Sequence, residues 1–229
     1  MPYRHTPFIT DQIYHVYNRS IAKQPIFLNH RDYQRAINTI EFYMYLRPPI
    51  RFSHYNRLEI NQKQSFLNQL KETRKPSVEI LSYCAMPNHI HLLIRQVEEK
   101  GISNLMRNFQ HSYSKYFNLK NDRTGGLFQA MFKAVRIETD EQLIHVSRYI
   151  HLNPVSSMLI KIEKLEDYLW SSFKDYILDT NSVLISPVLI LKYFKSKNKY
   201  KEFVFNQADY QKRLESIKHL TLDVKVSAN

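Results

Sequence analysis

The stretch SVEILSYCAMPNHIHLLIRQ, residues 77–96, decides the fold of this chain. It contains two strand-like apolar runs, 77–86 and 89–96. Between them, Pro87-Asn88 favours a tight turn. The pattern predicts two strands joined as a hairpin.

The second run begins with two histidines, His89 and His91, on either side of Ile90. Successive side chains of a strand point to opposite faces, so the two imidazoles share a face and form half of a metal site. With 10 histidines in 229 residues, about 0.4 such pairs arise by chance. The pair alone therefore leaves open two ordinary strand histidines bonded to backbone or water.

On the N-terminal side, residues 12–20 have the composition of a strand, and residues 29–46 and 57–74 have helical periodicity. On the C-terminal side, the pattern predicts a helix at 102–117, a strand at 132–138 and a helix at 139–153, which we expect to end before Pro154.

This order predicts an α+β fold of the ferredoxin-like β-α-β-β-α-β type. Its antiparallel sheet would carry helices on one face, with residues 47–76 as a helical insertion and the last helix as an addition. We expect one domain over residues 1–180. Residues 181–229 would form a basic, helical extension, in which the lysine-rich and aromatic stretch 192–201 is either a solvated helix face or a surface for single-stranded nucleic acid.

The composition limits the possible functions. The chain has 33 Lys and Arg against 21 Asp and Glu, a net charge of +12, which favours a polyanionic partner such as nucleic acid. Three glycines and no phosphate-loop motif argue against a nucleotide cofactor, and one cysteine, Cys84, excludes an internal disulfide. No signal peptide or membrane-spanning run occurs, so we expect a cytoplasmic protein without a membrane partner.

The predicted helix at 139–153 carries a second candidate group. Tyr149 and Asn153 are four residues apart and therefore lie on one face. Taken alone, Tyr149 could be one of 16 tyrosines filling a groove, and Asn153 could cap the end of the helix.

Four blocks in order resemble the single-tyrosine HUH transposases, named for the pattern of histidine, hydrophobic residue and histidine. The resemblance is strongest to the IS200-like transposases and the REP-associated tyrosine transposases, and it covers roughly residues 12 to 178. The blocks are YHVYNRS (14–20), MPNHIHLLI (86–94), GGLFQAMFKA (125–134) and SRYIHLNPV (147–155).

The resemblance implies a site. His89 and His91 become ligands of a divalent cation, Mg²⁺ or Mn²⁺, with Asn153 as the third ligand, and Tyr149 becomes the nucleophile. Two imidazoles and an amide should bind Mn²⁺ more tightly than Mg²⁺, which prefers oxygen ligands.

The resemblance also implies an activity. Such enzymes cleave and rejoin single-stranded DNA next to hairpins through a 5′-phosphotyrosine intermediate. Four cations near the blocks are candidate phosphate contacts and could equally be ordinary surface charges: Arg19, Lys133, Arg136 and Arg148. The active protein would be a monomer or a homodimer.

Three alternatives stay open. The protein could be a domesticated relative that binds hairpin DNA without transposing it. It could be a replication-initiator-like HUH nickase or a relaxase, although relaxases carry a three-histidine cluster and the motif supplies a pair. It could also be a metal phosphodiesterase that activates water and does not need Tyr149.

Overall fold

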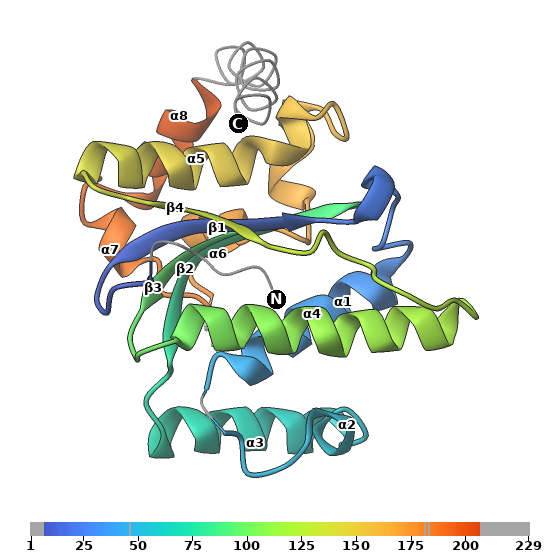
Figure 1. The fold of residues 1–229 in the computed structure, drawn as a ribbon. Coiled ribbons are helices and arrows are strands. Elements are labelled where there is room, and N and C mark those ends of the chain that lie inside the picture. Colours follow the sequence, from blue (N-terminus) through green and yellow to red (C-terminus); the bar gives the residue numbers. More distant parts are fainter. Residues whose placement is uncertain (1–6, 46, 181, 183, 207–229) are drawn as a thin grey trace.

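A single antiparallel sheet runs through the described part of the chain, which in this computed structural model comprises residues 7–45, 47–180, 182 and 184–206. Its strands, in the spatial order β2-β3-β1-β4, are β1 (Ile13–Arg19), β2 (Val78–Met86), β3 (His89–Gln96) and β4 (Lys133–Arg136). With helix α1 (His30–Tyr43) after β1 and helix α4 (Gly101–Lys120) after β3, this is the ferredoxin-like topology, so the predicted fold class is confirmed (Figure 1).

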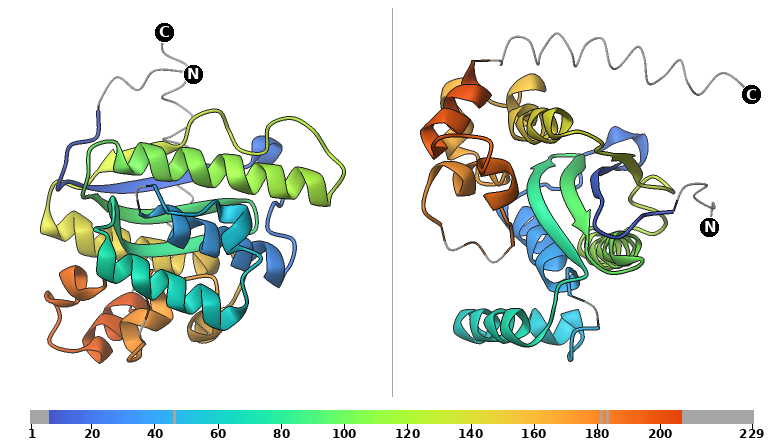
Figure 2. Two further views of the ribbon diagram at one scale, coloured as in Figure 1. Left: turned by 90° about the horizontal axis from the view of Figure 1, so that it is seen from below. Right: turned by 90° about the vertical axis from the view of Figure 1, so that its left-hand side faces the viewer.

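The hairpin of β2 and β3 forms where the sequence predicts it, with Met86 paired to His89 across the Pro87-Asn88 turn. Most residues of both strands are buried. The reason is that helices cover both faces of the sheet and not one: α1 and α4 lie on one face, and α5 (Asp140–Ser156) lies on the other (Figures 1 and 2).

Helices α1 and α4 pack against each other beneath the sheet. The side chain of Asn29 caps α1 by accepting a hydrogen bond from the backbone N–H of Asp32 at 3.2 Å. Ala36 and Ile40 of α1 and Phe109 of α4 are buried, as their helical spacing predicts.

Helix α5 begins after Thr139, whose hydroxyl accepts a hydrogen bond from the N–H of Gln142 at 3.1 Å. The expectation that the helix ends before Pro154 was wrong, because α5 continues to Ser156 with Pro154 inside its last turn. A proline removes one backbone N–H donor from a helix. The helical hydrogen bonds of α5 nevertheless continue beyond Pro154, since the Ser157 N–H donates to the Asn153 carbonyl at 3.0 Å. Asn153 is therefore an interior residue of the helix and not its cap.

The insertion forms two helices, α2 (Phe52–Tyr55) and α3 (Ile60–Thr73), on the side of α1 and α4 away from the sheet (Figure 1). Aromatic rings attach it to α1. The ring centroid of Phe42 on α1 lies 5.1 Å from that of Phe52 and 5.0 Å from that of Tyr55.

The described part of the C-terminal extension is helical and packs against the domain. Helix α6 (Phe173–Ile177) still belongs to the predicted domain over residues 1–180. In the extension, the short helix α7 (Val188–Leu191) leads to α8 (Lys197–Phe205), which packs on α5 and α6. Tyr200 is fully buried, whereas Lys195 and Lys199 are exposed. The lysines of stretch 192–201 thus lie largely on the outside of a packed element, and residues 207–229 of the predicted extension lie outside the described residues.

Candidate active site

The histidine pair opens β3, next to the central strand β1. The ring centroids of His89 and His91 are 4.9 Å apart, and the rings stand at 83° to each other. Ile90 between them is fully buried. The alternation of a strand therefore puts both imidazoles on one face, as predicted.

Strand β1 adds three residues to this face. In the antiparallel register Tyr17 lies opposite His91 and Arg19 lies opposite His89. His15 is two residues before Tyr17, on the same side of β1, and its Nε2 lies 2.9 Å from Nδ1 of His91. The site therefore contains a third histidine that the motif did not reveal. Alternation along YHVYNRS places His15, Tyr17 and Arg19 on one face, but their meeting with His91 depends on which strand pairs with β1.

Helix α5 brings the second group of candidate residues to the histidines. The ring centroid of Tyr149 lies 5.6 Å from that of His91 and 5.7 Å from that of His15, in both cases edge to face. Asn153, one turn later, is buried, and its side chain hydrogen-bonds His89. The structure thus brings Tyr149, His89, His91 and Asn153 together at one place on the sheet.

The surroundings hold His89 in its neutral form. The pKa of His89 is lowered from 6.5 to about 4, chiefly by burial and also by the positive charge of Arg19, while the hydrogen bond with Asn153 acts in the opposite direction. Burial also raises the pKa of the Tyr17 phenol, against the effect of Arg19. A neutral imidazole is the form that binds metal ions.

The donor set fits a divalent cation. Nδ1 of His89 is 2.6 Å from the side-chain oxygen of Asn88, and Nδ1 of His91 bonds His15. Metal-binding histidines commonly use one ring nitrogen for the ion and the other for such an orienting bond. The described residues contain no group of three His, Cys, Asp or Glu side chains arranged around an ion, so Asn153 would have to complete the set through its amide oxygen.

The four candidate phosphate contacts occupy different places. Arg19 and Lys133 lie on the face of the sheet that carries the histidines, since Lys133 pairs with Tyr17. Arg136 lies on the other face of β4 and bonds the side chain of Gln12 at 2.7 Å.

The fourth candidate, Arg148, is buried. Its guanidinium lies 4.2 Å from the centre of the Phe203 ring and its Nη2 lies 2.7 Å from Nδ1 of His145. The structure therefore places Arg148 between α5 and α8 and not beside the histidines.

These features define a ferredoxin-like domain whose histidine pair faces a tyrosine supplied by a helix. Residues 52–153 match the family model of IS200-like transposases, a range that includes His89, His91, Tyr149 and Asn153. The resemblance to this family is thereby confirmed for that part of the chain.

Among solved structures, that of the REP-associated tyrosine transposase bound to a REP hairpin is similar to this chain. The identity is 14% and the TM-score 0.49, over 81% of this chain and 91% of that chain. No curated protein matches the sequence. Within the described residues, no helix is long and apolar enough to cross a membrane.

Proposed function

We propose that the protein is a DNA strand transferase that cleaves and rejoins single-stranded DNA next to hairpins, with Tyr149 as its nucleophile. The observation that carries the proposal is the meeting of Tyr149 with His91, at 5.6 Å between ring centroids, on elements far apart in the sequence. The match of residues 52–153 to IS200-like transposases supports the reaction class.

In the proposed reaction, the phenol oxygen of Tyr149 attacks the scissile phosphorus. The bond from phosphorus to the 3′ oxygen breaks, the phenol gives up its proton, and the departing 3′ oxygen takes one up. The 5′ end stays on the enzyme as a phosphotyrosine, and a later 3′ hydroxyl reverses the step to join new ends. The phosphodiester energy is kept in the covalent link, so no ATP is needed.

The other residues of the site would bind and orient. His89, His91 and the amide oxygen of Asn153 would hold Mg²⁺ or Mn²⁺, which when bound polarises a nonbridging phosphate oxygen. His15 would hold the His91 ring in position through its 2.9 Å bond. Arg19 and Lys133, on the same face, would contact the phosphate backbone.

The third histidine does not favour a relaxase. In relaxases the cluster of three histidines binds one ion. Here His15 Nε2 and His91 Nδ1 bond each other, and two nitrogens that share a hydrogen bond cannot both bind the same cation. The pair with Asn153 is the set that the contacts support.

The test is a covalent adduct. A hairpin-bearing single strand mixed with the protein and Mn²⁺ should yield a protein–DNA band that survives denaturation, and Tyr149→Phe or EDTA should abolish the band. Tyr17→Phe is the matched control, because the ring of Tyr17 also lies close to His91, at 5.5 Å. That variant should keep the adduct.

An adduct that persists in Tyr149→Phe and disappears in Tyr17→Phe would move the nucleophile to β1. Hairpin binding without any adduct would favour the domesticated binding protein. An adduct that never leads to joined ends would favour the nickase, and cleavage by Tyr149→Phe would favour the phosphodiesterase that activates water.

A further inference from the structure

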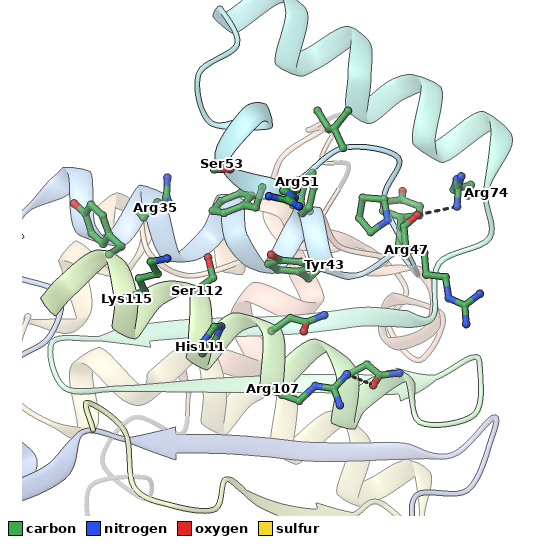
Figure 3. A pocket seen from close by; sticks show the side chains of 18 of the residues that line it. Arg35, Tyr43, Arg47, Arg51, Ser53, Arg74, Arg107, His111, Ser112 and Lys115 are labelled. Atoms are coloured by element: carbon green, nitrogen blue, oxygen red, sulfur yellow. Dashed lines mark hydrogen bonds between the residues drawn. The ribbon is translucent and has the colours of Figure 1, made fainter. Parts of the chain in front are cut away.

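A large groove lies on the other side of the sheet from the tyrosine site. Its volume is about 1530 Å³, and its walls come from α1, the loop and helix at 47–55, and α4 (Figure 3). The insertion therefore forms one wall of the groove, which the β-α-β-β-α-β core alone would not possess.

The lining of the groove is strongly basic. It contains six arginines and three lysines, and Glu99 is the one acidic residue among its described lining residues. That carboxylate lies next to Lys100, 3.3 Å away. Figure 3 shows Arg51 on the wall of the insertion and Lys115 on the wall of α4. Like charges brought together repel one another, so such a lining favours a polyanion between the walls.

Arg35, on α1, is the most informative of these cations. Its guanidinium lies 4.5 Å from the centre of the Phe52 ring and 5.1 Å from that of Tyr116. Its Nε is buried and has no hydrogen-bond partner in the described part of the protein. Burial lowers the pKa of Arg35, although the phenols of Tyr116 and Tyr43 act in the opposite direction. A partly buried cation with no carboxylate partner among the described residues would gain from an added anion.

The groove also offers groups that interact with bases. Tyr43 and Tyr116 are partly exposed in its lining, together with the amides of Asn104 and Asn108. Rings and amides between rows of cations are typical of sites for single strands, whose bases are unstacked, whereas a duplex presents mainly its backbone. We propose that this groove binds a segment of single-stranded DNA.

The inference rests on the proposed function only for the choice of DNA as the polyanion. The groove and the tyrosine site lie on opposite faces of the sheet, so the segment bound here is distinct from the one at the scissile phosphate (Figures 1 and 3). The role that follows for the insertion is to hold a stretch of the strand away from the cleavage point.

The test measures binding alone, in EDTA, where the proposed cleavage cannot proceed. The probe is a fluorescent oligothymidylate without a hairpin, titrated with the full chain over a range of NaCl concentrations. The double variant Arg51→Glu with Lys115→Glu should bind on the order of tenfold more weakly, and its salt slope should fall by about 0.7 for each phosphate that the variant no longer neutralises. Both side chains are exposed, so thermal stability should not change.

The matched control is Lys161→Glu with Lys174→Glu, which changes the net charge equally at two exposed positions outside both the groove and the stretch 192–201. This variant should keep nearly all of its affinity and its salt slope. Equal decreases in affinity in the two double variants would overturn the proposal, because the effect would then be one of total charge. Displacement of the probe by polyglutamate as effectively as by unlabelled oligothymidylate of equal charge would also overturn it, in favour of an acidic protein partner.

Discussion

At the scale of single residues, His15 is the main addition that the structure makes to the site. It lies on the central strand, bonds His91 at 2.9 Å and stands edge-on to Tyr149. It is thus in contact with a proposed ligand and with the proposed nucleophile. In the proposed site, its role would be to fix the orientation and tautomer of the His91 ring, which would leave the other nitrogen of that ring for the metal ion.

We expect His15→Ala to weaken the apparent affinity for Mn²⁺ by about 10- to 100-fold, because the His91 ring would lose its orienting bond. The measurement is adduct formation as a function of Mn²⁺ concentration, and excess Mn²⁺ should restore part of the rate. His15→Gln, which keeps a polar group, should have a smaller effect. A lower melting temperature with an unchanged Mn²⁺ dependence would mean that His15 only packs the sheet.

The structural role of Asn153 depends on where helix α5 ends. If α5 ended before Pro154, an Asn at this position would be a cap. Since α5 runs to Ser156, its side chain is free of that task, and it bonds His89. The amide also donates weakly to the Tyr149 carbonyl, at 3.4 Å. A ligand role for Asn153 stays a proposal, and the structure places the residue where that role requires it.

At the scale of elements, α5 carries both Tyr149 and Asn153, and α8 helps to hold it in place. His151 lies between these two residues and is fully buried. Its Nδ1 is 2.8 Å from the Tyr200 hydroxyl of α8, and its Nε2 is 2.9 Å from the Ser172 hydroxyl. The C-terminal extension is therefore connected through one imidazole to the helix that carries the proposed nucleophile.

We expect Tyr200→Phe to lower the free energy of unfolding by about 1–3 kcal/mol, because it leaves the buried Nδ1 of His151 without its partner and removes one of the two hydrogen bonds of the Ser147 hydroxyl. Chemical denaturation measures the change, and amide exchange of α5 should become faster. Tyr193→Phe is the control, since that side chain is 38% exposed. Equal stability of the two variants would contradict a supporting role of α8.

At the scale of the whole molecule, two groups of cations lie on opposite faces of the described structure. Arg19 and Lys133 lie on the face of the tyrosine site, and the nine cations of the groove lie on the opposite side. Two groups of cations thus lie on opposite faces, an arrangement that suits the proposed contacts with one long polyanion at two places.

The stability of the fold should depend on pH through Glu41, on α1. Burial raises the pKa of its carboxyl from 4.5 to about 7. Between these values the folded protein keeps a proton that the unfolded chain releases, so stability should fall as the pH rises from about 4.5 to about 7.

We therefore expect Glu41→Gln to be more stable than the natural protein at pH 8 and to lose most of this advantage at pH 5. Urea unfolding at the two pH values measures the difference, and Glu163→Gln, at an exposed position, is the control. A gain of the same size at both pH values would show that the effect comes from packing and not from the charge.

The sequence by itself determined the local directions of the key side chains. The alternation of a strand put His89 and His91 on one face, and the spacing of a helix put Tyr149 and Asn153 on another. It also predicted the order of elements, and hence the ferredoxin-like fold, because apolar periodicity is set by each element's own contact with the core.

Only the tertiary structure decided which of these faces meet. Residues 15 and 91 are far apart in the chain, and their bond depends on the pairing of β1 with β3. Arg148 looked like a phosphate contact beside Tyr149, yet the packing of α8 placed it over the Phe203 ring. The basic groove likewise exists because the insertion folds back against α1. The periodicity of a sequence shows on which side of its own helix or strand a residue lies. The register of strands and the docking of helices depend instead on packing summed over the whole core.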